Sequence, residues 1–158
     1  MLSLVIPDAD QVGRWLRQAN IQHYICDQCH GLHISELQGR DGVLDSRLFV
    51  EEDGLLISTE LEIRPSALLY LSGELGRLNM LFPSLKLFLD VNDDNLPRLV
   101  ACDLLLGRVG VTFEQFLNFV QVGVDATVQL LQEMQQMDVL YQGEPEDDVA
   151  PTSGGALH

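Results

Sequence analysis

The spacing of apolar residues changes several times along this 158-residue chain, and each change predicts a new structural element. Near the start, Asp8 and Gln11 form a capping-box pair, and apolar residues then recur at helical spacing. This pattern predicts a helix over residues 9–20. Two short apolar runs, 23–26 and 32–37, follow on either side of a turn and predict two short strands.

The middle of the chain alternates between apolar and polar residues with a period of two. Residues 44–50 and 55–63 predict a hairpin that has one buried and one solvent-facing side. Leucines at spacings of three and four then predict a helix over 65–80. Alternation returns at 85–91, and 99–106 is apolar on both sides, which is typical of a central strand. The expected order is therefore α-β-β-β-β-α-β-β-α, with a last helix described next.

The last helix is the most apolar element of the chain. Thr112 and Gln115 form a second capping box, and the apolar rhythm continues for about 25 residues, or about 37 Å of helix. A second apolar strip lies beside the first, and it comprises Phe119, Val122, Ala126 and Leu130. A helix that rests on one sheet needs an apolar stripe only about 100° wide. The surplus predicts a partner or dimer contact at this strip, whereas the alternative is a core helix enveloped by its own chain.

Length and composition favour one folded domain. With 46% hydrophobic residues, the chain can bury an ordinary core, which we place at residues 1–141. Residues 142–158 are acidic and contain Pro, Gly and Ser, so we expect a disordered tail. No secretory leader or membrane-spanning run is visible. These features predict a cytoplasmic protein with reduced thiols and no membrane partner.

The charge balance argues against nucleic acid as a partner. The chain has 24 acidic and nine basic residues, and its formal charge is −15. A protein that binds a phosphate backbone needs a basic patch, but the arginines here are scattered along the sequence. We therefore expect any regulatory role to operate without contact with DNA.

One short segment carries most of the candidate chemistry. Cys26 and Cys29 have the spacing of a metal-binding or redox pair, and His33 follows as a possible third ligand. A fourth ligand would have to be His30, Cys102 or His158, and no second Cys-x-x-Cys pair supports them. A thioredoxin-like site is disfavoured because a strand pattern follows the motif where a helix would be needed. Haem attachment is disfavoured without export. We therefore expect no metal and no cofactor, with cysteines that pack as small apolar side chains in a hairpin.

A series of motifs in fixed order resembles the YbjN family, in its enterobacterial branch that includes the AmyR proteins. The motifs are Ser3 to Pro7, the turn from Cys26 to His33, Asp41-Gly42-Val43 with Asp45, Arg64-Pro65-Ser66-Ala67, Asp93 to Pro97, and Gly110-Val111-Thr112 with Glu114-Gln115-Phe116. The resemblance covers residues 1 to about 140. It implies an α+β fold, with a twisted antiparallel sheet and three helices, similar to the class I type III secretion chaperones.

The resemblance also implies a function. Members are regarded as regulators of sensory transduction, with links to stress responses, motility, exopolysaccharide production and virulence, and without known catalytic residues. We therefore expect a non-enzymatic, dimeric regulator that acts through protein contacts and has no cofactor. The alternative is a zinc or thiol-redox sensor built on Cys26, Cys29 and His33. A small hydrolase or lyase with a site assembled from distant residues is a third hypothesis.

Overall fold

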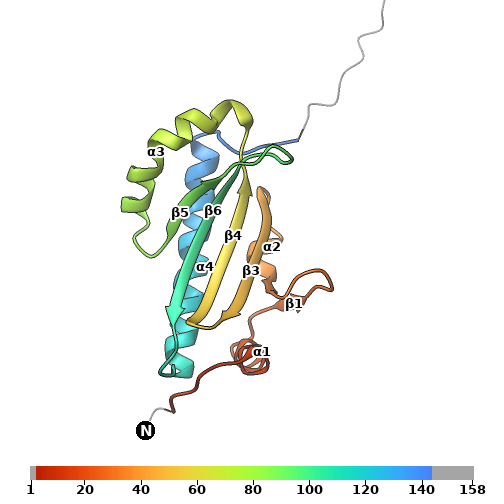
Figure 1. Ribbon diagram of the computed structural model, residues 1–158, viewed down its shortest axis with the longest axis vertical. Helices are drawn as coiled ribbons and strands as arrows, with labels where there is room; N and C mark the ends of the chain where they lie inside the picture. Colours follow the sequence, from red (N-terminus) through yellow and green to blue (C-terminus); the bar gives the residue numbers. More distant parts are fainter. Residues whose placement is uncertain (1–2, 144–158) are drawn as a thin grey trace, which may run out of the picture.

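The protein folds as one twisted sheet with helices on its back and ends. The computed structural model describes residues 3–143, and the expected tail therefore lies almost entirely outside the described residues. Six antiparallel strands are arranged in the order β1-β2-β3-β4-β6-β5. The long helix α4 runs behind the sheet, and Figure 1 shows no helix of the described residues across the front.

The bounds of the elements follow the expected order closely. They are α1 Ala9–Gln18, β1 His23–Ile25, β2 Leu32–Ile34, α2 Ser35–Gln38, β3 Val43–Glu51, β4 Gly54–Glu62, η1 Pro65–Ala67, α3 Leu68–Leu81, β5 Lys86–Asp90, β6 Arg98–Leu106 and α4 Phe113–Gln136. The α+β class and the antiparallel sheet are confirmed.

Both predicted capping pairs lie at the start of a helix, but only the pair at Thr112 forms a complete capping box. The Gln11 backbone N–H donates to Asp8 Oδ1 over 2.8 Å at the start of α1. At α4, the Gln115 N–H donates to Thr112 Oγ1, and the Thr112 N–H donates back to the Gln115 side chain. Each bond satisfies an amide that the helix itself cannot pair. The first helix ends earlier than expected, at Gln18, and Asn20 then takes a left-handed backbone conformation with φ 57°.

The strand expected over 32–37 is wrong in its second half. Only Leu32 and His33 pair with β3, and from Ser35 the chain turns into the short helix α2. The Ser35 N–H bonds back to Gln22 O, while the Gly39 N–H bonds to Ser35 O. This turn buries Leu37, which is 1% exposed, against the sheet. The described chain therefore has four α-helices, not the three expected.

Helix α4 joins two hydrophobic clusters on the back of the sheet. Toward its start, Phe116 and Val120 pack with α1 and with Leu55 and Ile57 of β4. Toward its end, Leu130 and neighbours pack with α3 and the far halves of β4 and β6. One helix thus serves both halves of the core, which explains why its apolar surface is so wide.

Candidate functional site

The cysteine turn lies at one edge of the sheet, between β1 and β2. Ile25 pairs with Leu32 to close the hairpin, and Cys26 follows directly after β1. His33 lies within β2, where its ring stacks on Tyr24 with centroids 4.7 Å apart. A side chain at Gly31 would meet Arg47 Cβ and Phe49 Cε1 at 3.0 Å. The turn is therefore seated closely against β3.

Within this turn, the structure brings together the three predicted ligand residues. The sulfurs of Cys26 and Cys29 are 2.6 Å apart, and each lies 3.2 Å from His33 Nε2. Both cysteines are half-buried, while His33 is only 5% exposed. The thiols thus contact each other and an imidazole, and they do not simply fill apolar space as we expected.

A glutamine fixes the orientation of the His33 ring. Gln38 Nε2 donates to Leu44 O, and the Ser46 N–H donates to Gln38 Oε1. These two bonds identify Oε1 as the acceptor that lies 2.8 Å from His33 Nδ1. In the neutral ring, Nδ1 therefore carries the hydrogen and Nε2 presents its lone pair to the two sulfurs.

The same contacts change the acidity of the pair. The hydrogen bond with Cys29, followed by that with His33, lowers the pKa of Cys26 from 9.0 to about 7. Burial has the opposite effect at Cys102, whose pKa is raised. The turn therefore presents a thiol that is partly ionised near neutral pH.

The proposed fourth ligands are not brought to this cluster. His30 is exposed and does not join the three-residue group, even though it is adjacent to Cys29 in sequence. Cys102 bonds to Ser58 on β4. The sheet register places it three strands from His33, or about 14 Å at the usual strand spacing. His158 lies outside the described residues.

Most of the predicted interface on α4 is buried in the chain's own core. Phe119 is 7% exposed and Leu130 is 0% exposed, and each belongs to one of the two clusters. Ala126 is half-buried against the sheet, and only Val122, at 43%, is open to solvent. The prediction that these four residues form an exposed strip is therefore wrong, because the sheet and the flanking helices already cover most of them from two sides.

Sequence reasoning missed a more exposed apolar surface on α3. Leu69 and Met80 are 87% and 83% exposed, and Tyr70 and Leu81 are each more than half exposed. We refer to these four residues as the α3 surface. A signal was present in the sequence, because the apolar residues of 68–81 are spread around the helix and do not form one stripe.

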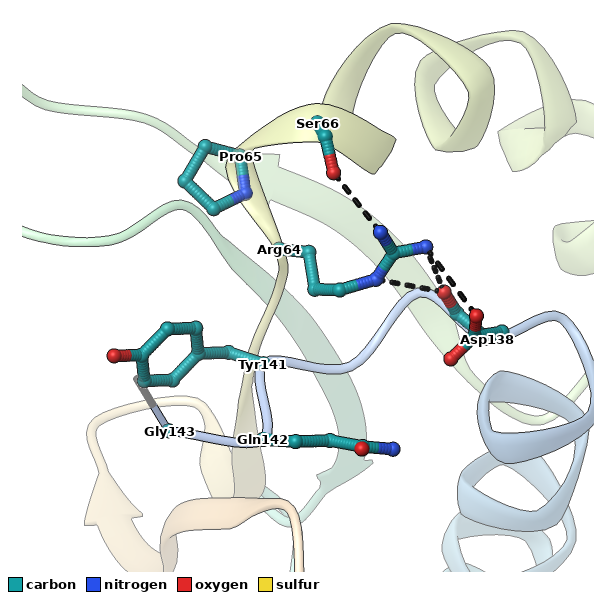
Figure 2. Close-up of a pocket in the computed structure, with 7 residues that line it drawn as sticks. All are labelled: Arg64, Pro65, Ser66, Asp138, Tyr141, Gln142 and Gly143. Atoms are coloured by element: carbon teal, nitrogen blue, oxygen red, sulfur yellow. Dashed lines mark hydrogen bonds and ion pairs between the residues drawn. The ribbon is translucent and has the colours of Figure 1, made fainter. Parts of the chain in front are cut away.

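One hollow of the described residues has a structural role. It is an open depression lined by Arg64, Ser66, Asp138 and Tyr141, among others. Figure 2 shows the Arg64 guanidinium pointing at Asp138 and Ser66. Arg64 Nε donates to Asp138 O over 2.9 Å, and another of its nitrogens donates to Ser66 Oγ. The guanidinium is thus occupied in holding the chain at the end of α4 against the end of β4.

None of the helices within residues 3–143 is long and apolar enough to cross a bilayer.

Known proteins are similar to this chain in sequence and in fold. The YbjN family model, described as "Putative bacterial sensory transduction regulator", matches residues 8–136. The YbjN proteins of Escherichia coli K12 and Shigella flexneri are each 35% identical over 158 residues, which is 100% of both chains compared. The crystal structure of E. coli YbjN, "a putative transcription regulator", superposes with a TM-score of 0.84 and 37% identity, over 88% of this chain and 99% of that chain.

A more distant structure shares the fold alone. It comes from Methanothermobacter thermautotrophicus, with a TM-score of 0.51 and 11% identity, over 81% of this chain and 96% of that chain. Neither structure is described as a type III secretion chaperone, so that similarity stays a prediction. The family match, the full-length relatives and the closely superposing crystal structure agree with one another, and the chain belongs to the YbjN family.

Proposed function

We propose that this protein is a non-enzymatic cytoplasmic regulator that acts as a homodimer through contacts with another protein. Its family is described as one of sensory transduction regulators, which supports the regulatory role. The charge of −15 supports a protein partner over nucleic acid. By family resemblance, the processes under negative control are exopolysaccharide production, motility or stress responses.

The observation that carries the proposal is the α3 surface. A monomer rarely leaves large apolar side chains clustered in water, and such clusters mark interaction sites. At 100° per residue, Leu69, Gly73, Gly76 and Met80 fall within a sector of about 60°. The core residues Leu71 and Leu78 lie on the opposite side of the helix. This stripe therefore faces away from the protein's own core, and both of its large side chains are exposed.

The stripe is arranged to suit a second copy of the same helix. Leu69 and Met80 are equally distant from the middle of α3, and so are Gly73 and Gly76. In a two-fold contact between antiparallel helices, Leu69 of one copy would lie near Met80 of the other, with glycines at the crossing. A Cβ added at either glycine would meet nothing within 4 Å, so a neighbouring backbone can approach closely.

Charge also favours self-association at this place. Helix α3 contains one acidic and one basic residue, Glu74 and Arg77, and these two form an ion pair. The helix is therefore neutral within a strongly acidic chain. Two copies can meet here without bringing like charges together.

Light scattering of purified variants tests the dimer. The wild-type protein should have twice the mass of one chain, and Leu69→Glu and Met80→Glu should each have the mass of a monomer. Val122→Glu is the matched control, because it places the same charge on an exposed apolar site of α4. A monomeric wild type would refute the dimer, and a Val122→Glu variant that alone dissociates would return the interface to α4.

Crosslinking in cells, followed by mass spectrometry, tests the regulatory role. The wild-type chain should crosslink to a protein partner. Deletion of the gene should raise exopolysaccharide or motility, and the wild-type chain should reverse this change. Unchanged phenotypes in the deletion strain, together with no partner above background, would overturn the proposal.

A further inference from the structure

Three donor atoms of the cysteine turn lie close together. The two thiol sulfurs and His33 Nε2 all lie within 4.8 Å of one another. They belong to a hairpin whose two strands have only three residues each. Such a short hairpin is marginal by itself, and a bond across its turn would stabilise it.

The imidazole is held as a metal ligand is held. A ligating histidine usually donates its second ring N–H to an oxygen acceptor, which fixes the ring and leaves the other nitrogen free to coordinate. Here that acceptor is Gln38 Oε1, and it is itself fixed by Ser46 and Leu44. The bond therefore aims Nε2 at the space between the sulfurs, and His33 is buried enough to hold this orientation.

We propose that Cys26, Cys29 and His33 bind one zinc ion, with Gln38 as the residue that positions the His33 ring. Two thiolates and an imidazole are donors that suit zinc, and they do not suit magnesium or calcium, which prefer oxygen ligands. Binding replaces the two thiol protons by two Zn–S bonds, and both protons pass to solvent. Three protein ligands leave the fourth tetrahedral position for water or for a ligand from outside the chain.

The site requires a small adjustment to accept the ion. With Zn–S bonds of about 2.3 Å and a Zn–N bond of about 2.1 Å, tetrahedral angles place the sulfurs about 3.8 Å apart. They would also place each sulfur about 3.6 Å from the nitrogen. The thiols are now closer, at 2.6 Å, so they must separate by about 1.2 Å. Both cysteines are half-buried in the turn, where side-chain rotation can supply this movement while His33 stays in place.

Zinc titration of the reduced, metal-free protein against a chromophoric chelator tests the site. We expect one zinc per chain. Cys26→Ser, Cys29→Ser and His33→Ala should abolish the binding. The matched controls are Cys102→Ser and His30→Ala, which remove the same chemical groups outside the cluster and should bind as the wild type does. Circular dichroism of each variant separates loss of the site from loss of the fold.

A second measurement tests Gln38 in its positioning role. Gln38→Ala should weaken zinc binding by about 10–100-fold, as is usual when the partner of a ligating histidine is lost. Gln38→Glu keeps an oxygen acceptor for Nδ1–H but loses the donor to Leu44 O, so it should recover only part of the affinity. With Co²⁺ in place of zinc, the wild type should show the thiolate charge-transfer band, and Cys29→Ser, which should bind no metal, should lose it.

Several outcomes would overturn the proposal. One is a reduced protein that binds no zinc, and another is binding that survives in Cys26→Ser. A third is a chain recovered from reducing cells with a Cys26–Cys29 disulfide and no affinity for zinc after reduction, which would identify the pair as a redox pair. The mass of the dimer is measured separately, so failure of the zinc site leaves the proposed regulatory function untouched.

Discussion

The acidity of the Cys26 thiol gives a prediction that alkylation rates can test in the metal-free protein. With a pKa of about 7, about half of Cys26 is thiolate at neutral pH. Burial raises the pKa of Cys102 above 9.0, so less than about 1% of it is ionised there. The thiolate fraction of Cys26 is thus about 50-fold that of Cys102, or more. The Cys26 thiolate is less basic by two pKa units, which lowers its intrinsic nucleophilicity about tenfold. Cys26 should therefore still be alkylated about fivefold faster than Cys102, or more.

The perturbation is Cys29→Ala, because the hydrogen bond with Cys29 is the largest cause of the lowered pKa. Its removal should raise the pKa of Cys26. Near pH 6, each unit of increase in the pKa of Cys26 lowers its thiolate fraction about tenfold and raises the nucleophilicity of the thiolate about threefold. The alkylation rate of Cys26 should therefore fall about threefold for each unit. The half-maximal pH should also move upward from about 7.

The assay is iodoacetamide labelling across a pH series, with peptide mass spectrometry to identify each thiol. A chelator keeps the protein free of metal, and Cys102→Ser serves as a background without the cysteine outside the turn. The reasoning is refuted by a Cys26 profile that is half-maximal near pH 9, or by a Cys29→Ala profile identical to that of the wild type.

Three further predictions concern the stability of the fold. Leu130→Ala should lower the free energy of unfolding by about 2–5 kcal/mol in chemical denaturation and leave the mass in light scattering unchanged, because Leu130 is 0% exposed in the core; a dissociated but fully stable variant would contradict this. Burial raises the pKa of Asp103, which means that the folded state binds its proton more tightly than the unfolded state does. Asp103→Asn should therefore raise the melting temperature near neutral pH, and it should have little effect in acid below the unfolded pKa. An equal effect at both pH values argues against this cause. Arg64→Ala should cost about 1–2 kcal/mol and speed amide exchange at residues 139–141, because the bonds that hold Asp138 O are lost; unchanged exchange would show that Arg64 does not hold this segment.

Much of the fold could be predicted from the sequence, because its main elements have strong local signals. The N-cap residues Asp8 and Thr112 predict the starts of α1 and α4, and each side chain accepts the expected bond from the backbone. The two-residue alternation in 44–50 and 55–63 corresponds to the paired strands β3 and β4. These signals depend on residues close in sequence, so a single chain is enough to recognise them.

The surfaces were harder to predict, since burial depends on contacts between distant elements. The width of the apolar stripe on α4 was recognised, but its cause was not, because α1 and α3 cover opposite ends of the same helix. Phe119 and Leu130 were therefore assigned to an interface when they belong to the core. At α3, the leucine spacing predicts the helix but not which of its side chains stay in solvent. Leu69 and Met80 are exposed because only one side of α3 packs on the core.

The cysteine turn shows how one misassigned element can conceal a site. The sequence identified Cys26, Cys29 and His33, but as three donors without a fixed geometry they favoured no metal. What fixes the geometry is Gln38, which reaches His33 Nδ1 only because residues 35–38 leave the strand and form α2. If the strand continued to Gln38, its rise of about 3.3 Å per residue would place Gln38 about 16 Å from His33. The switch from strand to helix therefore both buries Leu37 and completes the support of the imidazole. For this reason we expect substitutions in α2 to affect zinc affinity even though α2 supplies no ligand.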